Sequence, residues 1–294
     1  MPIIQVDWDK FEFRCHYLGD LMSEPKGKSN AEKYSELKSY KSSLFEKISA
    51  MNDGKLKDNA FIKFSETDKK LKELEPIKDV PLFSSTCLRR LAQIYTEQTT
   101  GRRKKIESFY IEKGLKTEEL SISLYSSVYE KFYRKNKERI SNGFVIGEID
   151  FDDEKEDIVI DTKSSFDIFT FDETIATGTK KLYYWQGQGY MWLKNRKHFR
   201  LAYCLNNTPS EIIFRLKNNL KYKFIGSPEE YEDACREIDE LHNYDDLPEK
   251  RKIRVYDIER NDEDINRLKT AIPHFREYLK NFDKNKTEEY ENQD

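Results

Sequence analysis

Two residues of a predicted strand have the side chains of a hydrolytic centre. Asp161 and Lys163 lie two residues apart in the β-branched run 157–163, and because side chains alternate along a strand, we expect both on one face. The preceding run, 144–151, carries a second carboxylate, Asp150, which a hairpin would bring beside Asp161. Two close carboxylates repel each other unless a cation lies between them, and Mg²⁺ takes oxygen ligands. The pattern therefore predicts a Mg²⁺ site with a lysine beside it; the alternative is an Asp–Lys salt pair on an edge strand.

A third carboxylate lies upstream, at a helical phase that turns it inward. If residues 116–135 form a helix, the stripe that starts at Glu118 continues through apolar side chains, whereas the stripe that starts at Glu119 is polar. A buried carboxylate needs a partner, and the predicted cation would be one. The alternative is a first-turn position, in which Glu118 only interacts favourably with the helix dipole.

An amide and a phenol lie on one face of a predicted aromatic-rich helix at residues 182–193. Gln186 and Tyr190 are four residues apart and share a face, whereas Gln188 lies on another face. Beside an acidic site, the first two side chains could hold a phosphate or the attacking water. The alternative is a stripe that belongs to the hydrophobic core.

Charge alternates in sign along the middle of the chain. Residues 141–176 carry 11 acidic and two basic residues, and residues 177–225 carry one acidic and ten basic residues. A metal-dependent enzyme that acts on a polyanion needs both kinds of surface, although solvated loops of opposite charge are the alternative. A basic group suited to a nucleic-acid backbone follows the glutamine helix and comprises Lys194, Arg196, Lys197 and Arg200.

The elements that must position these residues follow from the hydrophobic pattern. Residues 8–110 are predicted to be mostly helical, with a polar connection at 52–57 and a loop bounded by prolines at 76–81. Further strands are expected at 199–205 and 252–258, and further helices at 228–241 and 262–282. Together these elements predict an α/β protein with a central mixed sheet, flanked by helices, and a helical N-terminal region.

Composition excludes several classes of protein. The 294 residues are 36% charged with a formal net charge of −3 and are 13% aromatic, which argues against a disordered chain and against a tail of one charge sign. No apolar run reaches the length of a membrane helix, so we expect no membrane partner. The four scattered cysteines lack the spacing of a zinc or iron–sulfur site, and we expect reduced thiols.

Four motifs, in this order and at these spacings, resemble the PD-(D/E)XK nuclease superfamily, with its restriction-endonuclease-like core. Within it they resemble the phage lambda exonuclease-like (YqaJ-type) group, which is related to RecB-type nucleases. The similarity covers about residues 114–209. The four segments are Gly114–Glu118, Gly147–Asp150, Ile160–Ser165 and Gln186–Trp192.

The resemblance implies roles for individual residues. Lys163 matches the catalytic lysine of the D-x-K core. Gln186 with Tyr190 fits the RecB-type pattern, whereas Gln188 aligns with the glutamine of the lambda type. The implied metal ligands are Glu118, Asp150, Asp161 and the backbone carbonyl of Thr162.

Residues 14–28 resemble the opening of phage recombination exonucleases, in which an arginine and a hydroxyl residue help to hold the DNA 5′ phosphate. Arg14 matches this arginine, with Lys26 and Lys28 nearby, but His16 stands where a serine is usual. If His16 donates a hydrogen bond to the phosphate in place of the serine, the preference for a 5′ phosphate should strengthen as the imidazole is protonated below about pH 6.5. A second basic cluster would line the DNA channel, or would be solvated on an amphipathic helix: Arg89, Arg90, Arg102, Arg103, Lys104 and Lys105.

The implied activity is a Mg²⁺-dependent exonuclease, with Mn²⁺ as a substitute, that degrades double-stranded DNA ends from 5′ to 3′ in phage-type recombination. The implied setting is the cytoplasm of a bacterial or phage-infected cell, with a ring-shaped homo-oligomer and a single-strand annealing protein as partners. Residues 1–110 would contribute to the DNA channel, 111–225 would form the nuclease core, 226–282 would add a helix, a strand and a helix to the same domain, and 283–294 would form a flexible tail.

Two alternatives to this activity remain open at the level of the sequence. A RecB-like or restriction- or repair-type endonuclease would use the same core. A catalytically inactive module that only binds nucleic acid is the non-enzymatic alternative. The intact set of two acids and the D-x-K motif argues against the inactive module. Such carboxylates have no reason to stay clustered unless they bind a metal ion.

Overall fold

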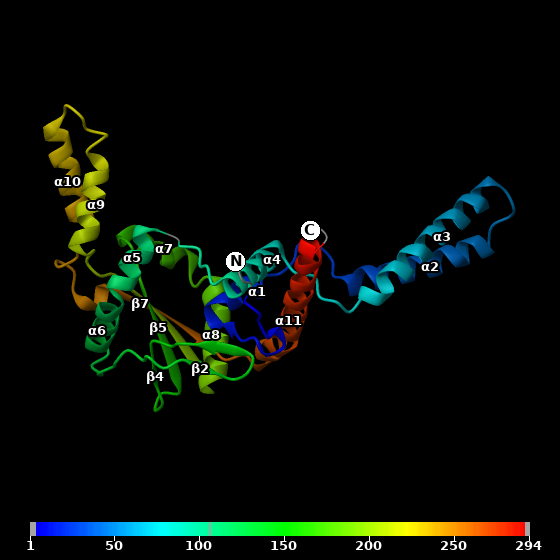
Figure 1. The fold of residues 1–294 in the computed structure, drawn as a ribbon, viewed down its shortest axis with the longest axis horizontal. Helices are drawn as coiled ribbons and strands as arrows, with labels where there is room; N and C mark the ends of the chain where they lie inside the picture. The colour runs from blue at the N-terminus through cyan, green and yellow to red at the C-terminus, as the bar shows by residue number, and fades with distance from the viewer. Residues whose placement is uncertain (1–3, 106, 292–294) are drawn as a thin grey trace.

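A four-stranded mixed sheet forms the centre of the protein (Figure 1). The computed structural model describes the backbone of residues 4–105 and 107–291 and the side chains of these residues up to Lys284. The second strand pairs antiparallel with the first and parallel with the third, and the fourth is antiparallel to the third. The predicted α/β class with a mixed sheet is thus confirmed. In spatial order the strands are β4 (Phe151–Asp153), β5 (Ile158–Ser164), β6 (His198–Cys204) and β7 (Ile253–Glu259).

Helices cover both faces of this sheet. Helix α6 (Glu118–Val128) packs on Ile158 and Ile160 of β5, while Val159 belongs to the core on the opposite face, where α8 (Lys181–Lys194) lies. Alternation along β5 therefore divides its side chains between two hydrophobic clusters. Helix α8 comes unusually close, because a Cβ atom at Gly187 would lie 2.3 Å from the ring of Phe199 on β6.

The predicted strand 144–151 is in fact two strands in two sheets. Strand β3 (Val145–Gly147) lies between β1 (Phe13–Arg14) and β2 (Ile140–Ser141) in a small second sheet, and the chain joins the main sheet only at Phe151. Gly147 packs so tightly that a Cβ atom there would lie 2.8 Å from the ring of Tyr190. The break leaves Asp150 at the junction between the two sheets.

The helical N-terminal region consists of a projecting arm and a part that packs on the body. Helices α2 (Asn30–Ser49) and α3 (Lys55–Leu74) form an antiparallel pair, called the α2–α3 arm below, which extends away from the sheet (Figure 1). Helix α1 (Leu18–Leu21) packs on α8, and α4 (Ser85–Thr100) packs on α1 and on α11 (Asp262–Glu291). The expected polar connection and helical content of this region are confirmed.

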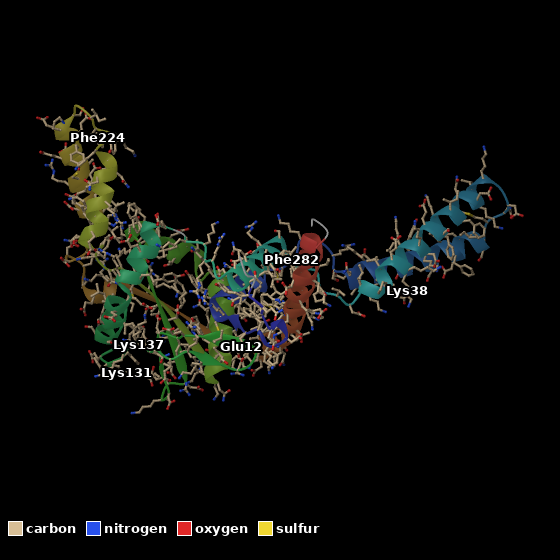
Figure 2. The ribbon with its side chains drawn as sticks, viewed as in Figure 1. Glu12, Lys38, Lys131, Lys137, Phe224 and Phe282 are labelled. Atoms are coloured by element: carbon tan, nitrogen blue, oxygen red, sulfur yellow. The ribbon has the colours of Figure 1, made fainter. Side chains whose placement is uncertain are left out.

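A second helical pair projects at the other end of the molecule. Helices α9 (Ser210–Leu220) and α10 (Pro228–His242) pack on each other, and Figure 2 shows Phe224 near their tip. Helix α10 was predicted, whereas α9 was not. The remaining elements are α5 (Phe109–Lys116), α7 (Ile168–Thr177) and four short 3₁₀ helices, η1 (Trp8–Lys10), η2 (Cys15–Tyr17), η3 (Glu75–Ile77) and η4 (Glu249–Arg251).

Two boundary predictions are wrong. The helix expected at 116–135 begins at Glu118, since Thr117 separates α5 from α6, and it ends at Val128. Residues 131–139 are irregular. The tail expected at 283–294 is helical up to Glu291, and Asp283 accepts hydrogen bonds from Tyr95 Oη (2.8 Å) and Trp8 Nε1 (3.4 Å). Residues 292–294 lie outside the described residues.

The described cysteines carry free thiols, as expected. Cys15, Cys87 and Cys204 are buried and Cys235 is half-buried. Over the described backbone, no helix combines the length and apolar character needed to span a bilayer.

Candidate active site

Asp161 and Lys163 lie on the same face of β5, as the alternation predicted. Asp161 is 2% exposed, and Lys163 Nζ lies 2.5 Å from Asp161 Oδ2. This face points toward α8, since Val159, two residues before Asp161, belongs to the cluster on that side. β5 lies between β4 and β6, but its pairing with β4 ends at Ile160, so among the described strands Asp161 and Lys163 pair with β6 alone.

Asp150 lies beside this pair at the end of the sheet junction. Its Oδ2 accepts hydrogen bonds from the backbone nitrogen (2.6 Å) and the hydroxyl (2.8 Å) of Thr162. Burial, together with the negative charge of Asp161, raises the pKa of Asp150 to about 7. Burial acts to lower the pKa of Lys163, but the charges of Asp161 and Asp150 outweigh it and raise that pKa. The two carboxylates therefore favour the ammonium form of Lys163.

Helix α8 supplies the amide and the phenol predicted for the site. Gln186 Nε2 donates to Tyr190 Oη at 3.0 Å and lies 3.4 Å from Asp161 Oδ1. Tyr190 Oη in turn donates to the backbone carbonyl of Glu148 at 3.1 Å. This chain of hydrogen bonds links α8 to both the carboxylate on β5 and the segment that leads to Asp150.

Gln188 does not share this arrangement. Its Nε2 donates to the carbonyl of Glu259 at 2.8 Å, and its Oε1 accepts from the backbone nitrogen of Asn261 at 2.9 Å. The side chain is completely buried in these contacts. Gln188 therefore fixes the connection between β7 and α11, and the structure does not place it with the catalytic candidates.

Glu118 is the first residue of α6 and is partly buried, with a side chain 30% exposed. Its partner is Lys135, whose Nζ lies 2.5 Å from Glu118 Oε2. The first-turn position and a charged partner are thus both present, while Glu119 is exposed as expected. Lys135 was missed because the sequence assigned it to a helix; the run of basic residues around it was the available signal.

The donor set can be tested against a divalent cation. Asp161 Oδ2 is buried and has no well-aligned hydrogen bond among the described residues, although the Lys163 ammonium lies near it. The neighbouring Asp150 resists ionisation next to it. Both observations fit a site that gains from a bound cation. Among the described side chains, no three His, Cys, Asp or Glu residues are gathered closely enough to hold a metal, and Glu118 is paired with Lys135.

An open cavity of about 290 Å³ adjoins the site on the side of the N-terminal segment. Its lining includes Arg14, His16, Glu148 and Tyr190. Burial and the charges of Arg14, Arg90 and Lys163 lower the pKa of His16 to about 4. The predicted Arg14 and Arg90 are thus close to each other and to the catalytic candidates.

Several predicted nucleic-acid contacts are neutralised instead by acidic side chains. Lys194 and Arg196 both pair with Asp152, at 3.3 and 2.8 Å, and Lys197 lies 3.7 Å from Asp157. Arg200 pairs with Asp257 at 2.6 Å. Acidic side chains of the β4–β5 hairpin thus lie beside Lys194, Arg196 and Lys197, and their role in binding nucleic acid stays a prediction.

The remaining basic candidates lie on exposed segments. Lys28 pairs with Glu36 at 2.5 Å at the start of the α2–α3 arm, and Lys26 is exposed. Arg90 pairs with Asp20 at 2.5 Å. The predicted DNA-binding residues on α4 and directly after it that are exposed are Arg89, Arg102, Arg103, Lys104 and Lys105.

Comparisons with known proteins show which solved structures share this fold. The chain matches no protein-family model and no curated protein. Among solved structures, it is similar to a phage-related exonuclease from Haemophilus somnus, with a TM-score of 0.64 and 21% identity over 94% of this chain and 96% of that one. The chain shares the fold of that exonuclease. The predicted nuclease-type core with a helical N-terminal region is confirmed at the level of the fold.

A second similar structure is an alkaline exonuclease, LHK-Exo, from Laribacter hongkongensis. It has a TM-score of 0.49 and 17% identity, over 74% of this chain and 92% of that one.

Proposed function

We propose that this protein is a metal-dependent deoxyribonuclease that degrades linear double-stranded DNA from its 5′ ends. The observation that carries the proposal is the buried pair of Asp161 and Lys163 on β5 beside Asp150, at 2.5 Å between the ammonium and the carboxylate. It occurs within a fold shared with a phage-related exonuclease. A buried ion pair contributes little net stability, so a catalytic use explains its presence better.

The residues that would hold Mg²⁺, or Mn²⁺ in its place, are Asp150 and Asp161, with Glu118 joining them after separation from Lys135. A bound divalent ion would stabilise charge on a phosphoryl oxygen and lower the pKa of a coordinated water. Asp150 and Asp161, with Glu118 nearby, form a fitting donor set, and among the described residues the buried Asp161 Oδ2 has only the Lys163 ammonium beside it. Thr162 would position Asp150 through its two hydrogen bonds.

The other side chains have roles that follow from their contacts. The Lys163 ammonium would stabilise the negative charge that develops on the phosphate and orient the attacking water. The neighbouring carboxylates raise the pKa of Lys163 and so favour its ammonium form, which suits this electrostatic role. Gln186 would hold Asp161 in its rotamer, and Tyr190 would tie α8 to the segment before Asp150.

The cavity lined by Arg14 would receive the 5′-terminal phosphate. A terminal phosphate carries more charge than an internal diester and binds more strongly to a guanidinium. Duplexes with 5′-phosphate ends should therefore be degraded faster than duplexes with 5′-hydroxyl ends, and Arg14→Ala should remove the difference. The preference should not strengthen just below pH 6.5, because burial and nearby cations lower the pKa of His16 to about 4.

The test of the function uses three DNA substrates: a linear duplex labelled at one 5′ end, the same duplex labelled at a 3′ end, and a covalently closed circle. We expect loss of the linear duplexes in Mg²⁺, early release of the 5′ label, and no cutting of the circle. Cleavage of the circle would support the endonuclease alternative. Binding without hydrolysis in either Mg²⁺ or Mn²⁺ would support the inactive module.

The cytoplasmic setting, the ring-shaped homo-oligomer and the single-strand annealing protein stay predictions of the family resemblance. Light scattering of the purified protein would measure the oligomeric state. Processivity on long duplexes is the property that a ring would add.

A further inference from the structure

The irregular segment 131–139, called the basic loop below, connects α6 to β2. It carries five basic residues and a single acidic one, Glu138. Figure 2 labels two of the basic side chains, Lys131 and Lys137. The sequence pattern predicted a helix over the first half of this loop, so its contacts emerge only from the fold.

The inner side of the basic loop is bound to the candidate active site. Asn136 donates its backbone N–H to the carbonyl of Asp150 at 2.6 Å and its Nδ2 to the carbonyl of Ile149 at 3.3 Å. Lys135 pairs with Glu118 at 2.5 Å. The loop is therefore fixed to the backbone of one catalytic carboxylate and to the side chain of another.

The outer side of the loop exposes an aromatic ring and cations. Phe132 is 80% exposed, and the guanidinium carbon of Arg134 lies 5.3 Å from its ring centre. Within the described chain, neither Arg134 nor Lys137 has an ion-pair partner, whereas Lys131 pairs with Asp153 at 3.1 Å. Leaving a large apolar ring in water is unfavourable unless a ligand covers it.

Among the residues that the structure describes, Arg134 and Lys137 lack acidic partners, whereas the basic residues at the end of α8 and after it face acidic side chains. Cations without an acidic partner are the groups that gain from phosphate contacts and counterion release. An exposed aromatic ring next to a guanidinium can stack on a nucleobase of any sequence. The loop thus offers both kinds of contact that a sequence-independent nuclease needs.

We propose that the basic loop binds the DNA strand that enters the active site. Lys137 and Arg134 would contact its phosphates, and Phe132 would stack on a base exposed at the opened end. This inference rests on the proposed function, since the ligand is the substrate of the same site. It assigns substrate positioning to residues outside the four sequence motifs.

The proposal is tested by DNA binding in EDTA, which keeps the probe intact. The probe is a fluorescent 30-base-pair duplex with a short single-stranded end, titrated by anisotropy at several salt concentrations. We expect Lys137→Gln and Arg134→Gln to weaken binding by about 3- to 10-fold and to lower the slope of log K against log salt by about 1. Lys38→Gln, on the α2–α3 arm (Figure 2), removes the same charge as a control and should leave both unchanged.

Phe132 is tested with two replacements. Phe132→Leu removes stacking but keeps an apolar side chain, and should weaken binding of the single-stranded end by about 5-fold or more. Phe132→Tyr should restore it. All these side chains are exposed, so circular dichroism should show unchanged folding.

The outcomes separate this inference from the proposed function. Equal losses for Lys137→Gln and Lys38→Gln, or no loss for any loop variant while the wild-type protein binds and hydrolyses DNA, would overturn the loop assignment alone. A wild-type protein that neither binds nor hydrolyses DNA would overturn the proposed function as well.

Discussion

At the scale of single residues, the site is a set of charges held where water is scarce. Asp161 is almost fully buried, and Lys163 is its close partner. Removing two such charges from water costs several kcal/mol per ion before their attraction is counted. Asp150 adds a further negative charge, which its raised pKa reflects. The site is thus stabilised by a cation or by a proton.

This balance predicts an unusual effect of Asp150→Asn on stability. The unfolded carboxyl has a pKa of about 4 and the folded one about 7, so the folded protein binds the extra proton between these values. Its stability therefore falls as the pH rises through that window. In EDTA at pH 8, Asp150→Asn should raise the melting temperature by about 3 to 6 °C, with little change at pH 4.

Differential scanning calorimetry measures this effect at both pH values. Thr162→Val is a control that loses one hydrogen bond to Asp150 without removing its charge, and should not stabilise the protein. A lower melting temperature for Asp150→Asn at pH 8 would show that the ionised carboxylate is stabilising without metal.

At the scale of elements, the helix α6 makes two adjacent glutamates unequal. Glu118 pairs with Lys135 near the site, and Glu119 faces solvent. Glu118→Gln should lower turnover by about 100-fold or more, whereas Glu119→Gln should change it by less than about 2-fold. The measurement is steady-state hydrolysis at saturating Mg²⁺. Similar effects of the two changes would show that α6 does not present Glu118 to the substrate.

Helix α8 separates two glutamines that the sequence could not. Gln186→Ala should reduce turnover with little loss of stability, because it contacts Asp161 and Tyr190. Gln188→Ala should cost about 1 to 3 kcal/mol of unfolding free energy, because it leaves the groups of Glu259 and Asn261 unpaired. Urea unfolding and turnover, measured on both variants, distinguish the roles. A normal stability for Gln188→Ala would contradict its structural assignment.

The sequence predicts elements whose signal is local. The alternation around Asp161 and the pattern of α8 and β7 were sufficient, and the structure has these elements within about one residue of their expected bounds. The break after Gly147 was not predictable, since it follows from the pairing of Val145 and Ile146 with Phe13 and Arg14, which are distant in sequence. The partner of Glu118, Lys135, was likewise not predictable, because it lies in an irregular loop without hydrophobic periodicity.

At the scale of the whole molecule, the charge pattern serves two purposes. Acidic residues of the β4–β5 hairpin pair with Lys194 and Arg196, while Arg14 and Arg139 line the cavity. The near-zero net charge therefore hides local compensation in one place and a local positive site in another. The two helical pairs project from opposite ends of this body (Figure 1).

The α2–α3 arm should be dispensable for folding of the body. Its buried residues Leu44, Ile48 and Leu71 belong to neither core cluster of the sheet. Asn30 Nδ2 donates to the carbonyl of Ile77 at 3.2 Å, so the chain enters and leaves the arm at neighbouring points. Replacing residues 31–76 by a short Gly/Ser linker should preserve cooperative thermal unfolding and keep hydrolysis within about 3-fold.

Loss of cooperative unfolding in the shortened protein would show that the arm belongs to the folding core. Normal folding with strongly reduced hydrolysis would assign the arm to the DNA channel instead. A scrambled arm of equal length, with the same charges, is the matched control for the second outcome.

The central claim is that Asp161 and Lys163 form a catalytic pair. It is tested most directly by measuring Mg²⁺ binding by calorimetry and hydrolysis of a linear duplex for Asp161→Asn and Lys163→Ala. Both variants should fold and lose hydrolysis; Asp161→Asn should also lose most Mg²⁺ affinity, whereas Lys163→Ala should retain it. Near wild-type turnover of either variant at saturating Mg²⁺ would contradict the claim.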